Sequence, residues 1–264
     1  MSKCKLSIIG LGNMGKTILN GIESSNLIKP YLIGLYTLEE DILNNYSKKG
    51  YTIFKDEKDL CDNSEIVLLA IKPQGIEELV NKIKDSNIKC LVSILAGVSI
   101  DYYHKNFNCP IIRIMPNMPL QINKGASAIS HDDKVDKKDL DLIIDIFKSM
   151  GVVNIIDESL MNDILVVNGS TPAYVYYFIN AMINDAVKRG IDEEVAKEMI
   201  IQTFIGSSLM LKNSNKTIQE QIDAVCSKGG TTIEAINTFK EKNLDEIIHL
   251  ANTNCINRAK VIGK

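Results

Sequence analysis

The chain has 264 residues, of which 30 are basic and 33 acidic, and its formal net charge is −3 at pH 7. The length suits one large domain or two, and 45% apolar residues are enough for a buried core. The near balance of charge gives no reason to expect nucleic acid or an anionic membrane as partner. No uninterrupted apolar run approaches the ~20 residues of a membrane span, so no membrane association is expected.

The six cysteines are scattered along the chain and include no C-x-x-C pair. This usage predicts reduced, mostly buried thiols in a cytoplasmic protein. His104, His131 and His249 are isolated from other ligand types, so no metal site is expected. The first predicted strand begins so early that we expect no secretory signal peptide.

A glycine-rich turn follows the first predicted strand, at residues 6–9. Gly10, Gly12 and Gly15 give the pattern G-x-G-x-x-G, and a helical pattern of apolar residues follows. Gly10 permits a tight turn, Gly12 lets a pyrophosphate approach the backbone, and Gly15 lets the helix lie close to the strand. The free N–H groups and positive dipole of the helix then face the phosphates, which predicts a dinucleotide site.

Strand and helix alternate through the rest of the first half. The order β-α-β-α-β with short connections predicts a parallel, doubly wound sheet, an α/β fold. Helices are expected at 39–49, 76–84 and 139–149. Further strands are expected at 31–36, 51–54, 66–71, 90–95, 111–115, 126–129 and 152–156.

From about Asp157 apolar residues recur every three or four positions, which predicts helices only. We therefore expect a dinucleotide-binding domain over 1–157 and an all-helical domain over 158–264. Several of these helices are apolar around much of their circumference, so we expect a dimer interface. Pro172 and Asp192 each indicate a helix start, and a further helix is expected from about Leu244. Two more helix starts are indicated by capping boxes, at Thr217–Glu220 and Thr231–Glu234.

Ligands of doubly wound sheets bind beyond the carboxyl ends of the strands. Besides the glycine turn, three segments fall there: Ala70–Pro73, Ala96-Gly97 and Pro116–Pro119. An acid at the end of the second strand usually holds the adenosine ribose of NAD, but here Thr37 stands there, with Glu39 and Glu40 slightly later. Because no arginine is nearby for a 2′-phosphate and Thr37 suits both cofactors, the choice between NADPH and NADH stays open.

A second anion site is predicted at residues 227–233, where Gly229 and Gly230 precede Thr231 and Thr232 at a helix start. Backbone N–H groups point outward there with hydroxyls beside them, and a small carboxylate would fit. Simple helix capping by Thr231 and Glu234 is an equal alternative for this stretch.

Taken together, these motifs resemble the pyrroline-5-carboxylate reductase family, and the match spans nearly the whole chain. The resemblance implies a Rossmann domain plus an all-helical dimerisation domain, with dimers that often assemble into decamers. It rests on Gly10–Gly15, Ala70–Pro73, Arg113–Pro119, Gly169–Tyr174 and Gly229–Ile233, in the family's order and spacing.

The resemblance implies NADPH or NADH as cofactor and a cyclic imino acid as substrate, which is reduced to proline. Ser227, Gly229, Gly230 and Thr231 would hold the substrate carboxylate, and the Thr232 hydroxyl would face the ring nitrogen as the catalytic group. No His, Asp or Glu in these motifs is an obvious proton donor. The residues expected at the cofactor are Gly10, Leu11, Gly12, Asn13, Met14, Gly15, Thr37, Ala70, Ile71, Lys72, Pro73, Ala96, Gly97 and Asn117.

The sequence departs from the family pattern at Asn168, Thr171 and Lys228, where serine, glycine and proline are usual, and Asn162 stands where an acid is common. These departures leave a non-catalytic dinucleotide-binding paralogue as one alternative. A β-hydroxyacid-type dehydrogenase is another, but it would carry a lysine on the first long helix after the sheet. Residues 173–187 contain none.

Overall fold

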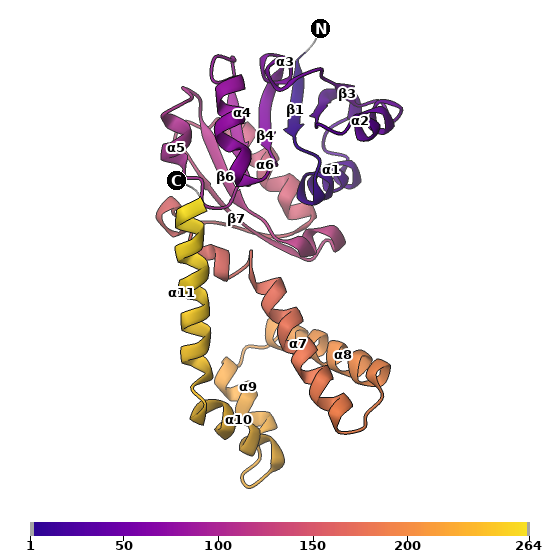
Figure 1. Ribbon diagram of the computed structural model, residues 1–264, viewed down its shortest axis with the longest axis vertical. Helices are drawn as coiled ribbons and strands as arrows, with labels where there is room; N and C mark the ends of the chain where they lie inside the picture. Colours follow the sequence, from indigo (N-terminus) through magenta and orange to yellow (C-terminus); the bar gives the residue numbers. More distant parts are fainter. Residues whose placement is uncertain (1–2, 263–264) are drawn as a thin grey trace. The chain divides into compact units, whose positions relative to one another are not determined.

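The apolar runs of the first half form one eight-stranded sheet in the computed structural model, which describes residues 3–262 (Figure 1). The strand order is β3-β2-β1-β4-β5-β6-β7-β8, which confirms a doubly wound α/β fold. The strands are β1 (Cys4–Ile9), β2 (Ile33–Tyr36), β3 (Thr52–Ile53), β4 (Ser64–Leu69), β5 (Cys90–Ser93), β6 (Ile111–Met115), β7 (Gly125–His131) and β8 (Gly151–Ile155).

One neighbouring pair departs from the predicted parallel arrangement. β6 and β7 pair antiparallel, with Ile114 opposite Ile129. Only the nine residues 116–124, including the short 3₁₀ helix η3 (Met118–Ile122), join the two strands. A parallel crossover needs a dozen or more residues, so the chain turns back on itself here.

Helices cover both faces of the sheet (Figure 1). Apolar side chains of α1 and α6 share one buried cluster, and those of α3, α4 and α5 share another. The short helices α3 and α5 were missed from the sequence because fewer than two turns give little periodicity. The helices are α1 (Asn13–Ser25), α2 (Glu40–Ser47), α3 (Glu57–Asp62), α4 (Ile76–Ile83), α5 (Ile100–His104) and α6 (Lys137–Ser149).

The chain divides into two compact units, of which the second is Ala173–Asn254 and the first is the described remainder. The second unit is helical, as predicted. Within the isolated chain, α7, α9 and α10 contain no buried residue, and α8 contains only Ala196. The helices of this half are α7 (Thr171–Lys188), α8 (Glu193–Lys212), α9 (Ile218–Val225), α10 (Thr231–Glu241) and α11 (Leu244–Ile262).

The predicted helix starts have different outcomes. The carboxylate of Asp192 caps α8, and Thr217 with Glu220 forms a complete capping box on α9. The capping box predicted at Thr231 is wrong. Gly230 is the N-cap of α10, without a side-chain cap, because Gly229 at φ +74° turns the chain one residue earlier than expected.

All six cysteines are free, and four of them are buried. Burial raises the pKa of Cys61 and Cys90 to about 12, so these thiols stay protonated at neutral pH. Within residues 3–262, no helix combines the length and apolar character that a membrane span requires. The same residues contain no cluster of three or more His, Cys, Asp or Glu side chains suited to a metal ion.

A buried carboxylate ties α6 to the sheet. The side chain of Asp139 is 3% exposed and lies 2.8 Å from Nζ of Lys5 and 3.3 Å from Nζ of Lys89. Burial opposes the charge on Asp139, but the hydrogen bond and charge of Lys5, with Lys89, outweigh burial and lower the pKa of this carboxyl. The ion pair therefore stabilises the fold above the unfolded pKa near 4, and this contribution is lost as pH falls through the lower folded value.

We expect Asp139→Asn to lower the free energy of unfolding by about 1–2 kcal/mol at pH 7, because Lys5 and Lys89 lose their buried carboxylate partner and keep only the more exposed Glu65. The difference from wild type should shrink as pH falls from the unfolded pKa near 4 through the lower folded pKa, because the wild-type carboxyl is then protonated first in the unfolded and next in the folded protein. Urea denaturation at several pH values measures this. Asp141→Asn is the control, since its exposed pair with Lys137 on the same helix should change stability by less than about 0.5 kcal/mol. An equal loss in both variants would contradict the assignment.

Candidate active site

The carboxyl ends of β1 and β4 lie side by side, at the point where the strand order reverses. The amide N–H of Ala70 donates to the carbonyl of Ile9 at 2.8 Å, and that of Gly10 donates to Tyr36 at 2.9 Å. Gly10 has φ +98°, and a Cβ there would lie 2.7 Å from the carbonyl oxygen of Ala70. Glycine at position 10 is therefore required by both the backbone conformation and the space.

The N-terminus of α1 begins directly after this turn. Gly12 is its N-cap without a side-chain cap, so the amides of the first turn keep free N–H groups. An added Cβ on Gly12 would meet no atom within 4 Å, whereas one on Gly15 would collide with the carbonyl of Gly10. The two positions thus do different work, because Gly15 allows the helix to pack closely and Gly12 leaves the helix end open to a phosphate.

A cavity of about 360 Å³ opens beside this helix end. It brings together segments that the sequence analysis singled out from three strand ends, and it adds residues from α3 and α4. Of the predicted cofactor residues, those lining it are Gly10, Leu11, Gly12, Thr37, Ala70, Ile71 and Lys72. Other lining residues include Tyr36, Leu38, Glu39, Glu57, Glu78 and Lys82.

Charged groups of α3 and α4 shape the far wall of the cavity. Nζ of Lys82 lies 3.0 Å from a carboxylate oxygen of Glu78 and 3.1 Å from one of Glu57. These two hydrogen bonds raise the pKa of Lys82 to about 12. The Glu78–Lys82 spacing of four is visible in the sequence, but no sequence signal places the pair at the cavity.

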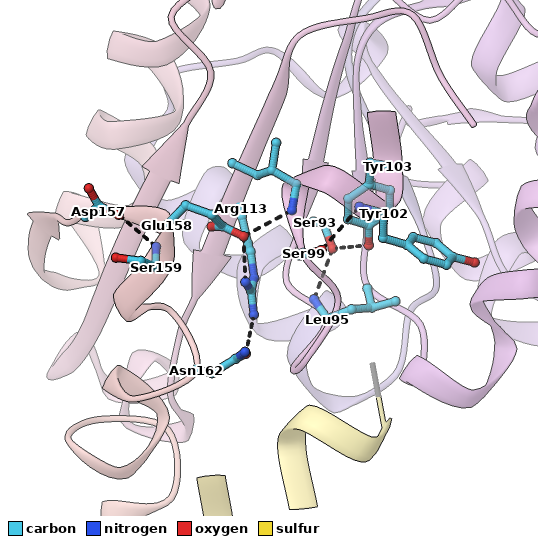
Figure 2. Close-up of polar contacts among 11 residues, drawn as sticks. Ser93, Leu95, Ser99, Tyr102, Tyr103, Arg113, Asp157, Glu158, Ser159 and Asn162 are labelled. Carbon is cyan, nitrogen blue, oxygen red and sulfur yellow. Dashed lines mark hydrogen bonds and ion pairs between the residues drawn. The ribbon is translucent and has the colours of Figure 1, made fainter. Parts of the chain in front are cut away.

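Ala96 and Gly97 lie in a loop after β5, outside the residues that line the cavity. Two separate sets of hydrogen bonds fix the two ends of this loop (Figure 2). The hydroxyl of Ser93 accepts from the amide of Leu95 at 3.2 Å and lies 2.6 Å from the hydroxyl of Tyr103. At the other end, the carboxylate of Glu158 accepts from the amide of Ile100 at 3.0 Å.

Glu158 also pairs with Arg113 of β6, at 2.8 Å. The side chain of Arg113 is only 1% exposed, so its charge needs this partner inside the fold. A second guanidinium nitrogen donates to Asn162 at 3.0 Å (Figure 2). Asn162, a departure from the family pattern, therefore still acts as a hydrogen-bond acceptor for Arg113 although it brings no charge.

Asn117 and Asn168 form a second buried network, between the end of β6, the start of β7 and the segment before α7. The amide oxygen of Asn117 accepts from Ala126 at 2.9 Å, and its nitrogen donates to the carbonyl of Asn168 at 3.2 Å. The Asn168 side chain donates to the carbonyls of Met115 and Ala126, at 2.7 and 2.9 Å. Both ends of the Asn117 amide thus bind the protein itself, and a serine at 168 could not donate both of these bonds.

The predicted carboxylate site lies in the second unit, at the N-terminus of α10. Gly229 is left-handed and Gly230 extended, and the Gly230 amide donates to the carbonyl of Ser227 at 3.0 Å. Thr231 and Thr232 occupy the first turn, where the amides keep free N–H groups. Thr232 also lines a cavity of about 290 Å³ whose other walls are mostly apolar side chains of α8, α9 and α10.

The predicted sites therefore form as two separate clusters, one in each compact unit. Asn13, Met14 and Gly15 lie in the first turn of α1, and Pro73 begins the 3₁₀ helix η2 (Pro73–Gly75) after Lys72. Sequence reasoning missed the carboxylates of Glu57 and Glu78, because they lie on helices away from any recognised motif.

Comparison with known proteins matches both halves of the chain. Residues 158–262 match the family model described as pyrroline-5-carboxylate reductase dimerisation, and residues 5–97 match one described as NADP oxidoreductase coenzyme F420-dependent. The pyrroline-5-carboxylate reductase of Escherichia coli K12 is 32% identical over 98% of both chains, and that of Methanosarcina acetivorans is 29% identical over 100% of both. The crystal structure of the Plasmodium falciparum pyrroline carboxylate reductase with NADP bound, 28% identical, has a TM-score of 0.89 over 100% of both chains.

The doubly wound sheet, the open glycine turn at β1 and the helical second half define a nicotinamide-dinucleotide oxidoreductase with a Rossmann domain. Within that class, the full-length similarity is decisive. The chain belongs to the pyrroline-5-carboxylate reductase family.

We expect Gly12→Ala to weaken dinucleotide binding by about tenfold or more, a loss of about 1.4 kcal/mol, with little change in stability. The added methyl group meets no protein atom but occupies the approach to the helix end. Isothermal titration calorimetry measures the affinity. Gly10→Ala is the contrasting variant, expected to lose about 1–3 kcal/mol of unfolding free energy through strain and contact with Ala70. Wild-type affinity in Gly12→Ala would remove this turn from the cofactor site.

Proposed function

We propose that this chain catalyses the NAD(P)H-dependent reduction of 1-pyrroline-5-carboxylate to L-proline. The observation that carries the proposal is its end-to-end similarity to reductases of that name, among them one solved with NADP bound. The two glycine-containing helix starts, before α1 and before α10, supply the anion sites that a dinucleotide and an amino-acid-like substrate require.

Residues 1–157 form the proposed dinucleotide-binding domain, and 158–264 the domain for dimerisation and substrate binding. The match of residues 158–262 to the dimerisation model supports this division, although the compact second unit begins later, at Ala173.

The cofactor site fits a nicotinamide dinucleotide. The open helix end at Gly12 suits the pyrophosphate, and the cavity between Thr37 and Lys72 suits the adenosine half. Ala70, Ile71 and Pro73 form the β4 side of the site. When bound, the reduced cofactor supplies the hydride.

Backbone N–H groups at the start of α10 hold the substrate carboxylate in this proposal. Thr231 and Thr232 present these amides, and Ser227, Gly229 and Gly230 shape the turn before them, where the Gly230 amide already donates to Ser227. With the substrate carboxylate held at one point, the substrate ring can still rotate about that point. The Thr232 hydroxyl orients the ring nitrogen and thereby directs the imine carbon toward the hydride donor.

The work of the protein is then positioning and electrostatics. Protonation of the ring nitrogen makes the adjacent carbon a strong hydride acceptor, and an imine of this kind can be protonated in solution before it binds. No acidic side chain at the α10 turn is needed for that step. Hydride addition to the iminium carbon gives the secondary amine of proline.

Self-association through the second unit belongs to the same proposal. Large apolar side chains of α7 and α8 are exposed in the single chain, for example Tyr177 at 75% and Met199 at 66%. Burying such surfaces against a second copy would be strongly favourable. Assembly of dimers into decamers and a cytoplasmic location stay predictions.

Two alternatives lose support in the structure. The α7 helix carries one lysine, Lys188, at its last position, so it lacks the lysine of a β-hydroxyacid-type dehydrogenase. The departures at 168 and 171 have local explanations that do not require a lost activity. Asn168 joins β6 to β7, and the Thr171 hydroxyl donates to the carbonyl of Val166 at 2.7 Å.

We expect the purified protein to oxidise NADH or NADPH, followed at 340 nm, only when 1-pyrroline-5-carboxylate is present. The product should be proline, identified by mass spectrometry. Cofactor binding without turnover would favour the non-catalytic paralogue. Turnover of β-hydroxyacids with NAD(P)⁺, but not of the imine, would favour the dehydrogenase.

We expect Thr232→Ala to lower kcat/KM by ~10-fold or more, the scale of one charge-assisted hydrogen bond. Thr238→Ala is the matched control on the same helix, because its hydroxyl donates to the carbonyl of Glu234 at 2.9 Å. Steady-state kinetics with varied imine concentration measure both variants. Equal kinetics for Thr232→Ala and wild type would remove Thr232 from the site.

A further inference from the structure

The cofactor cavity is bordered by three carboxylates that come from three separate elements. Glu39 precedes α2, Glu57 begins α3 and Glu78 lies on α4. We propose that these carboxylates make the site select NADH over NADPH, by repelling the 2′-phosphate that distinguishes the two cofactors. This inference rests on the proposed use of a nicotinamide dinucleotide and names which of the two the site takes.

The cavity offers little positive charge to a 2′-phosphate. Two lysines line it, and Lys82 is held by both Glu57 and Glu78 at 3.1 and 3.0 Å. Its charge is therefore already neutralised by carboxylates. Lys72 is the other lining lysine. Three carboxylates line the same cavity, so the lining carries one more negative than positive charge. No arginine lines the cavity, so the bidentate contact that usually holds a phosphate is absent from its described walls.

The loop that follows β2 is where the ribose hydroxyls are read in this fold class. Thr37, Leu38 and Glu39 form this wall of the cavity. Glu39 is exposed, and its side chain does not cap α2, so the carboxylate is free to accept hydrogen bonds from a ribose diol. In NADPH the 2′-hydroxyl is esterified to a phosphate, so it can no longer donate a hydrogen bond to Glu39. The phosphate also places roughly two negative charges beside this carboxylate.

The start of α2 does not compensate for this. A free helix N-terminus attracts a phosphate, but Glu40 and Asp41 occupy the first turn of α2, beside Glu39. The three consecutive carboxylates of Glu39, Glu40 and Asp41 thus neutralise the positive end of the helix, which then attracts a phosphate less strongly. Tyr36 also lines this cavity, and the pKa of its hydroxyl is raised, first by burial and then by the negative charge of Glu57.

The test compares NAD⁺ and NADP⁺ binding to the full chain by isothermal titration calorimetry, with no substrate present. We expect NAD⁺ to bind at least ~10-fold more tightly, and the ratio to fall as salt screens the carboxylates. Equal affinity, or tighter NADP⁺ binding, would overturn the inference and leave the proposed function intact. Failure of both dinucleotides to bind would overturn the proposed function as well.

A matched pair of variants tests whether the Glu39 carboxylate contributes to the choice between NADH and NADPH. Glu39→Gln should lower the ratio of NAD⁺ affinity to NADP⁺ affinity about 3-fold or more, and Glu39→Lys should lower it further. Glu40→Gln removes a neighbouring charge that does not line the cavity, and it should change the ratio less than Glu39→Gln does. Melting temperatures show whether each variant folds. An equal change at 39 and 40 would assign the effect to general charge and overturn the role of Glu39.

Discussion

The close contact between the glycine turn and the end of β4 is the constraint on which the cofactor site depends. Gly10 faces the backbone of Ala70, and Gly15 faces the backbone of Gly10, so neither position has room for a side chain. This packing places the first turn of α1 at the edge of the sheet where the strand order reverses. An open helix end at that edge is the physical basis for holding a diphosphate, because the N–H groups of its first turn have no partner among residues 3–262.

Polar contacts also hold the loops and strand ends that follow β5 and β6. The pair of Arg113 and Glu158 fixes the loop after β5, and the amides of Asn117 and Asn168 join β6 to β7. Arg113, Asn117 and Asn168 are buried, Glu158 is partly buried, and all four bind the protein itself, so their first role is to shape the loops. A site built this way is rigid because its supporting hydrogen bonds would leave buried polar groups unpaired if they broke.

The second unit poses a different physical problem. Its helices bury almost nothing within one chain, and they expose many large apolar residues. The match of residues 158–262 to a model described as pyrroline-5-carboxylate reductase dimerisation supports the proposal that these surfaces are buried against a second copy. Substrate binding and self-association are therefore encoded by the same stretch of chain in the proposed function.

The sequence by itself determined the eight strands, the longer helices, the glycine turn at 10–15, the helical second half and the family, because these depend on local periodicity and on motifs of fixed spacing. It failed at two points where the local course of the backbone decided the outcome. The short connection after β6 makes β7 antiparallel, and the left-handed Gly229 places the N-cap of α10 at Gly230. Only the tertiary structure brought Glu57 and Glu78 to the cavity that Thr37 and Glu39 border, because charges from separate helices meet only after the sheet has assembled.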